Sequence, residues 1–83
     1  MTESDNQVPE LIMVEGVIKR SQIGVGTWTL VGMGRTMEIF RAKPQEILQE
    51  GLRVRVTGRI RTDVMTAAMV GPVFEIESFQ ILK

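Results

Sequence analysis

Residues 53–61 read RVRVTGRIR, and the character of the side chains alternates along this stretch. Neighbouring residues of a β-strand point to opposite faces, so a period of two predicts a strand with one apolar and one cationic face. The apolar or small residues are Val54, Val56, Gly58 and Ile60, and the other face carries Arg53, Arg55, Thr57, Arg59 and Arg61. The apolar face is predicted to point into a core, which leaves the guanidinium groups on an outer face.

Four other segments are also predicted to be strands. The first is rich in branched apolar residues and contains Gly16, where a missing side chain permits tight curvature. The second and third flank Gly32-Met33-Gly34, whose glycines allow the positive φ of a tight hairpin turn. The five predicted strands cover residues 10–20, 27–31, 35–41, 52–61 and 73–83.

The last strand changes phase within its length. Phe74 and Ile76 share one phase, whereas Phe79 and Ile81 fall out of step with them. One extra residue in a strand shifts the phase of everything that follows it. A β-bulge is therefore predicted near Ser78.

A helix is predicted between the third and fourth strands. Pro44 suits the first helical turn, and Gly51 is a typical residue after a helix end. Ile47 and Leu48 would form the apolar side of this helix. Residues 43–51 are therefore predicted to form a helix of about two turns.

This order of elements resembles the OB-fold, a five-stranded Greek-key barrel with its helix between the third and fourth strands. The phrases EGLRVRVTGRI and GPVFEIESFQI are similar to the end of many small bacterial OB-fold proteins, several families of which have no assigned function. The resemblance covers about residues 10–83 and implies an all-β barrel. An SH3-like barrel is the main structural alternative, but it would not normally place a helix midway. A pattern of apolar and glycine positions implies a fold and not an activity.

Composition limits the chemistry that the chain can perform. Its 83 residues suit one small domain, predicted over residues 9–83 after an acidic tail at 1–8 that we expect to be disordered. Cysteine and histidine are absent, which excludes disulfides, thiolate nucleophiles, imidazole bases and the usual soft metal ligands. The carboxylates show no local spacing typical of a catalytic pair. We expect a cytoplasmic, non-catalytic protein with no cofactor, no metal and no membrane partner.

The arginine face allows two interpretations. Guanidinium groups at alternate positions would form a track for nucleic-acid phosphates. Alternatively, they would pair with carboxylates across the sheet, because an OB barrel places its fourth strand between the first and the fifth. Those two strands carry Glu15, Glu75 and Glu77. We favour pairing, since OB-folds usually bind ligands over their second and third strands.

That usual ligand surface has few aromatic residues, and base stacking requires exposed rings. Phe74 and Phe79 are expected to fill the barrel, and Trp28 is expected in the core because it shares a phase with Leu30. Phe40 is then the candidate exposed ring. The candidate set for single-stranded nucleic acid is Lys19, Arg20, Arg35, Phe40 and Arg41, helped by Arg53, Arg55, Arg59 and Arg61.

The connection after the fourth strand is unusually apolar for a loop. It would lengthen the flanking hairpin, cap one end of the barrel, or expose adaptable methionine side chains to a partner. The candidate contact residues are Val64, Met65, Ala67, Ala68, Met69 and Val70. The sequence therefore predicts an OB-fold module that acts through protein contact or self-association at this connection. The alternative function is weak binding of single-stranded nucleic acid.

Overall fold

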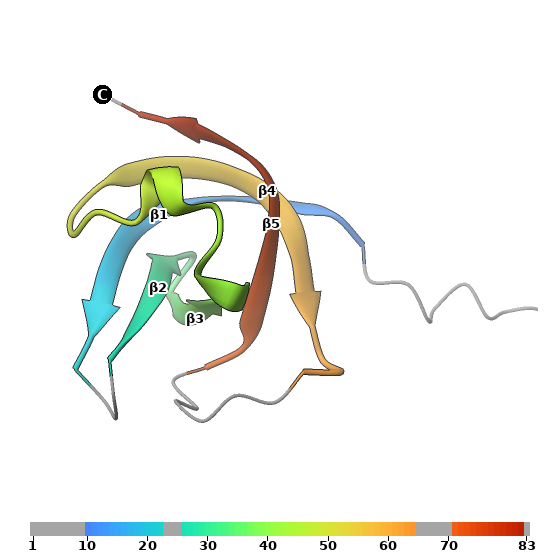
Figure 1. Cartoon of the computed structure of the whole chain (residues 1–83). Coiled ribbons are helices and arrows are strands. Elements are labelled where there is room, and N and C mark those ends of the chain that lie inside the picture. Colours follow the sequence, from blue (N-terminus) through green and yellow to red (C-terminus); the bar gives the residue numbers. More distant parts are fainter. Residues whose placement is uncertain (1–9, 23–25, 65–70, 83) are drawn as a thin grey trace, which may run out of the picture.

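The computed structural model describes residues 10–22, 26–64 and 71–82, which form a closed β-barrel (Figure 1). The strands are joined in the order β1-β2-β3-β5-β4, and β4 pairs with β1 to close the barrel. Neighbouring strands are antiparallel except β3 and β5, which run parallel. The strands are β1 (Ile12–Ser21), β2 (Thr27–Gly32), β3 (Arg35–Ile39), β4 (Arg53–Arg61) and β5 (Val73–Ile81).

This architecture confirms the predicted all-β, five-stranded barrel and is consistent with an OB-like fold. As predicted, β4 lies between β1 and β5. The β2–β3 hairpin turns at Met33 and Gly34, whose φ angles are 55° and 74°. Two positive φ angles in a two-residue loop are typical of a type I′ turn, whose twist matches that of the flanking strands. The glycine-rich segment therefore forms the predicted hairpin.

The core is formed by the inner faces of the strands. Val54 and Val56 are fully buried, which confirms that the apolar face of β4 points inward. Burying a large apolar side chain contributes about 1.5–3 kcal/mol, so this set dominates the stability of a small barrel. The other buried hydrophobic residues are Val14, Ile18, Leu30, Met37, Ile39, Ile47, Val73 and Phe74.

The connection between β3 and β4 differs from the helix predicted for residues 43–51. The chain forms two single 3₁₀ turns, η2 (Phe40–Ala42) and η3 (Gln45–Ile47). Pro44 is extended at the N-cap of η3, and Leu48 leaves helical geometry. A helix of two turns gains little from its own hydrogen bonds, so tertiary packing decides its length. One turn is enough to bury Ile47 completely in the core.

β5 contains the predicted bulge, one residue before the expected position. Thr57 pairs with Ser78, whereas Gly58 pairs with Ile76, so Glu77 is an extra residue on β5. Because a one-residue shift turns every following side chain to the opposite face, the bulge reverses the phase of β5 at this point. Apolar residues therefore face inward on both sides of Glu77.

Gly58 makes room for this bulge. A Cβ atom at position 58 would overlap the carbonyl oxygen of Glu75 and lie 3.0 Å from the Cα of Ile76. Both neighbours belong to the backbone of the adjacent strand, so neither can rotate away. Position 58 requires glycine for the close approach of two strands.

We predict that Gly58→Ala lowers the free energy of unfolding by about 3 kcal/mol, because its methyl group meets backbone atoms. Gly34→Ala is the matched control. Its φ of 74° is strained for alanine, but no atom lies within 4 Å of the added Cβ, so a loss of about 1 kcal/mol is expected. Urea denaturation measures both variants, and equal losses would contradict the close approach at Gly58.

Candidate functional site

Arginines on the outer face of β4 bind carboxylates of the neighbouring strands. Arg55 donates from Nε and Nη2 to Glu15 on β1, at 2.8 and 2.7 Å. Arg59 Nη1 lies 2.8 Å from Glu77 Oε2 on β5. These carboxylates are the cross-strand partners expected from the sequence. The pairs neutralise much of the positive field that a phosphate track would need.

Arg61 binds two carboxylates. Its Nε and Nη2 atoms donate to both oxygens of Asp63, at 2.9 and 2.8 Å, and Nη1 donates to Glu75 at 2.9 Å. The hydrogen bonds from Arg61 lower the pKa of Asp63 to about 2, and those to Asp63 and Glu75 raise the pKa of Arg61. Asp63 was not among the partners predicted from the sequence, although its spacing of two residues from Arg61 was a visible signal. In the described part of the chain, Arg53 forms no ion pair.

The lowered pKa of Asp63 predicts a change of stability at acid pH. Its contribution is present above the ordinary pKa of 3.8 and is lost as the pH falls towards 2. Asp63→Asn should remove this part of the pH dependence. Glu46→Gln is the control, because Glu46 is an exposed carboxylate with no ion pair among the described residues. Urea unfolding across this pH range tests both variants, and parallel curves for the wild type and Asp63→Asn would contradict the assignment.

The nucleic-acid candidates outside β4 fall on separate parts of the barrel. Lys19 and Arg20 lie on β1 beside β2. Arg35 lies at the hairpin turn where β3 begins. Phe40 and Arg41 follow the opposite end of β3. The structure does not bring this set together into one continuous track.

Arginine side chains pack over two aromatic rings near the β2–β3 surface. Trp28 is partly buried against the core, so it is intermediate between the predicted core position and a free surface. The guanidinium carbon of Arg20 lies 5.5 Å from its ring centroid. Phe40 is also partly buried, and the guanidinium carbons of Arg41 and Arg61 lie 4.9 and 5.0 Å from its centroid. These cation–π contacts reduce the ring area open to a stacked base.

Two residues on the outer face of β2 and β3 are buried. Thr29 and Glu38 are register partners in the outward phase, because Leu30 and Met37 next to them point into the core. Even so, Thr29 and Glu38 are 2% and 8% exposed. The Thr29 hydroxyl donates to the carbonyl of Lys19 at 2.8 Å. Alternation alone did not predict this burial, which leaves less of the usual OB ligand surface open.

β5 continues beyond its contact with β3 (Figure 1). β3 pairs only with Val73 and Phe74, so among the described strands the rest of β5 is paired with β4 alone. Phe79 and Ile81 are 39% and 42% exposed, although their partners on β4 are buried. The expectation that Phe79 fills the barrel is therefore wrong. Its side chain lies in the inward phase, but β3 does not extend far enough to cover it.

The same half of β5 has an unpaired backbone edge. Leu82 donates its N–H to the carbonyl of Arg53 at 2.9 Å. Successive residues of a strand direct their N–H and C=O groups to alternate sides, so Phe79 and Ile81 direct theirs away from β4. No backbone group within the described ranges meets them on that side. An edge of this kind is a template for pairing with another strand.

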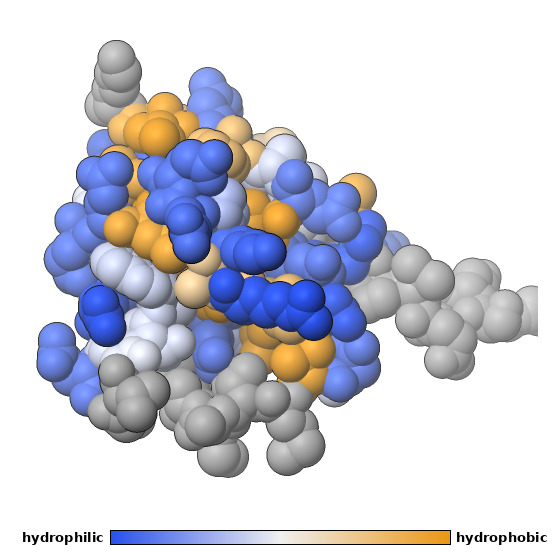
Figure 2. Space-filling model, viewed as in Figure 1, coloured by the Kyte–Doolittle hydropathy of each residue, from blue (hydrophilic) through white to orange (hydrophobic). Residues whose placement is uncertain are grey.

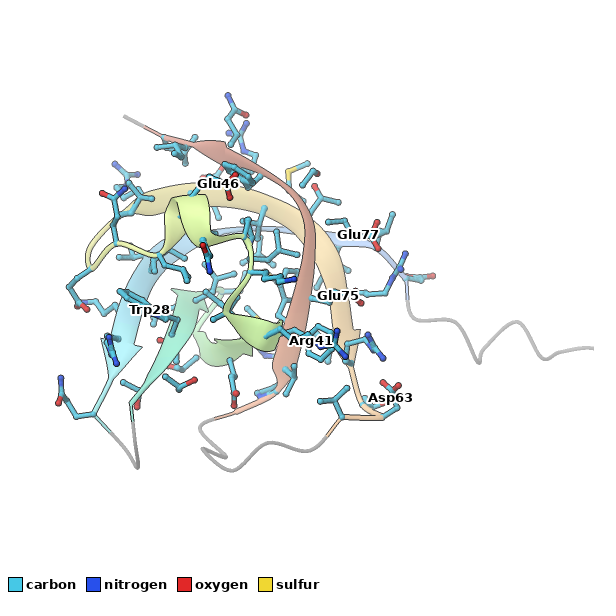
Figure 3. All side chains as sticks on the ribbon, viewed as in Figure 1. Trp28, Arg41, Glu46, Asp63, Glu75 and Glu77 are labelled. Atoms are coloured by element: carbon cyan, nitrogen blue, oxygen red, sulfur yellow. The ribbon has the colours of Figure 1, made fainter. Side chains whose placement is uncertain are left out.

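A groove lies between this half of β5 and the connection that follows β3. It consists of two adjoining hollows of about 670 and 240 Å³ that share Lys43 and Ile76. We call it the β5 groove, lined by residues 40, 41 and 43–46 on one side and by residues 75–77 and 79 on the other. Figure 2 shows hydrophilic and hydrophobic residues interspersed on this face. Figure 3 places Glu46 on η3 and Arg41 on η2, with Glu75 and Glu77 on the neighbouring β5.

The predicted contact connection is only partly described. Val64 is half-buried at the end that follows β4. The other candidate residues, Met65, Ala67, Ala68, Met69 and Val70, lie outside the described residues. Their role in protein contact stays a prediction.

Comparison with known proteins does not assign this chain to a family. No protein-family model matches it, and no curated protein or solved structure matches it. Among the described residues, no group of acidic side chains is placed to hold a metal ion. In the same part of the chain, no helix is long and apolar enough to cross a membrane. Function therefore has to be inferred from the geometry of the β5 groove and its surroundings.

Proposed function

We propose that this chain is a non-catalytic binding module that contacts another protein by accepting an extended segment along the β5 groove. The observation that carries the proposal is the unpaired edge of β5, with Phe79 and Ile81 exposed beside it. An added strand gains main-chain hydrogen bonds on such an edge, while pockets beside the edge select alternate side chains. The edge and the groove together provide both parts of this binding mode.

The apolar content of the site supports the same proposal. Ile76 is shared by both hollows, and Phe79 lines the larger one. Removing the exposed part of these side chains from water would contribute roughly 25 cal/mol per Å² of apolar surface covered. A second copy of the chain that pairs at this edge would be one form of protein contact. The cytoplasmic setting expected from the sequence remains part of the proposal.

Single-stranded nucleic acid is the second candidate ligand. Arg20 beside Trp28 supplies one cation and one ring where β1 pairs with β2. This candidate ranks lower because Arg55, Arg59 and Arg61 are engaged by carboxylates of the barrel itself. Micromolar binding of mixed-sequence single-stranded DNA that weakens steeply with salt would move it ahead.

We predict that the wild-type chain selects peptides from a random library displayed on phage, and that Phe79→Asp does not. The aspartate removes an apolar contact and adds a charge within the groove. Met33→Asp is the matched control, because Met33 is 65% exposed at the β2–β3 turn and does not line the groove. Circular dichroism verifies that each variant is folded before selection.

Equal selection by the wild type and Phe79→Asp, or loss of selection in Met33→Asp as well, would contradict the proposed surface. Sedimentation at several protein concentrations accompanies the selection. A mass that rises with concentration, and does not rise in Phe79→Asp, would identify a second copy as the occupant of this edge.

A further inference from the structure

Some charged side chains along the β5 groove form ion pairs with described residues, and others do not. Glu75 and Glu77 are each ion-paired with an arginine of β4, at 2.9 and 2.8 Å. Arg41 and Lys43 are exposed and form no ion pair with any residue that the structure describes. Both cations line the smaller hollow. Within the described ranges, this end of the groove therefore has ion-paired acids and cations that lack an ion pair.

Arg41 lies in a turn of unusual backbone conformation. Its φ is 56° and that of Ala42 is 50°, in the left-handed region that residues with a Cβ atom seldom occupy. Such conformations cost of order 1–3 kcal/mol each and are often found at binding sites. The turn is accompanied by the contact of the Arg41 guanidinium with Phe40, at 4.9 Å. A cation that already packs against a ring loses less conformational freedom when it binds an anion.

The larger hollow contains an exposed acidic side chain in addition to Lys43. Glu46 lines it together with Phe79, is exposed, and has no ion pair within the described ranges. Lys43 and Ile76 line both hollows and mark where the two adjoin. The groove therefore differs along its length: the smaller hollow has Arg41 and Lys43, whereas the larger one has Lys43 together with an acid that has no ion pair among the described residues.

We propose that the segment bound in the β5 groove carries an acidic side chain held by Arg41 and Lys43, with an apolar side chain two residues away against Phe79. This inference rests on the proposed function. Residues i and i+2 of an extended strand project to the same face, roughly 7 Å apart, so each reaches one of two adjoining hollows. A carboxylate accepts charge-assisted hydrogen bonds from guanidinium and ammonium groups. Glu46 repels an acid at the other end, which fixes the register of the segment.

The test is selection of peptides from a random phage-displayed library by the full chain and by the double variant Arg41→Gln/Lys43→Gln. The wild type should enrich peptides with Asp or Glu two positions from an apolar residue. The double variant should lose the preference for an acid and keep that for an apolar residue. Lys19→Gln/Arg35→Gln is the matched control, because it removes two exposed cations that lie outside the groove.

One enriched peptide is then synthesised with its acidic residue intact or replaced by the corresponding amide. Fluorescence anisotropy should show about a ten-fold weaker affinity of the amide peptide for the wild type, because a charge-assisted bond is lost. The two peptides should bind the Arg41→Gln/Lys43→Gln variant with equal affinity. The control double variant should distinguish the two peptides as the wild type does.

The outcomes separate this inference from the proposed function. Two results would overturn the inference that the bound segment carries an acid: enriched peptides that show no preference for an acid, or a preference that survives in Arg41→Gln/Lys43→Gln. Either result leaves protein contact at β5 in place. If the wild type enriches no peptide and stays monomeric at every concentration, the proposed function itself is contradicted. A second copy in the groove, detected as a mass that rises with concentration and falls on adding the peptide, also overturns the inference.

Discussion

The close approach of two backbones at Gly58 is the constraint on which the shape of the barrel depends. The carbonyl oxygen of Glu75 occupies the place where a side chain on residue 58 would begin. This approach accompanies the insertion of Glu77 as an extra residue in β5. Without that residue, Phe79 would turn towards the outer, cationic face of the sheet. With it, the inner face of β5 stays apolar beyond the end of β3 and becomes one wall of the β5 groove.

The same bulge also affects the distribution of charge. Glu77 lies on the outer face, where it binds Arg59, so the arginines of β4 find most of their partners within the barrel. Exposed pairs of this kind contribute only about 0–1 kcal/mol each to stability, but they remove cations from the set available to ligands. Among the residues that the structure describes, the cations left without a carboxylate include Arg41 and Lys43 beside the groove. The positions of these cations therefore indicate where an anionic group could bind better than their number does.

The parts of the fold that depend on local pattern could be predicted from the sequence. Alternation in residues 53–61 predicted both faces of β4, and the broken phase of the last strand predicted the bulge. The predicted two-turn helix was wrong, because burial of Ile47 needs a single turn and a short pattern does not encode that geometry. The exposure of Phe79 and the burial of Thr29 depend on where neighbouring strands end and on packing between distant segments. The groove could not be predicted for the same reason, since its two walls are about thirty residues apart in the chain.

Strand addition at β5 is tested most sharply by amide hydrogen exchange of this chain, measured by NMR with and without a peptide selected by it. Fast exchange is expected at the N–H groups of Phe79 and Ile81 in the free protein, because they point away from β4. Both should become protected when the peptide is bound. The N–H of Leu82, which already donates to Arg53, should change little. Peptide binding that leaves the exchange of Phe79 and Ile81 unaltered would contradict strand addition at β5.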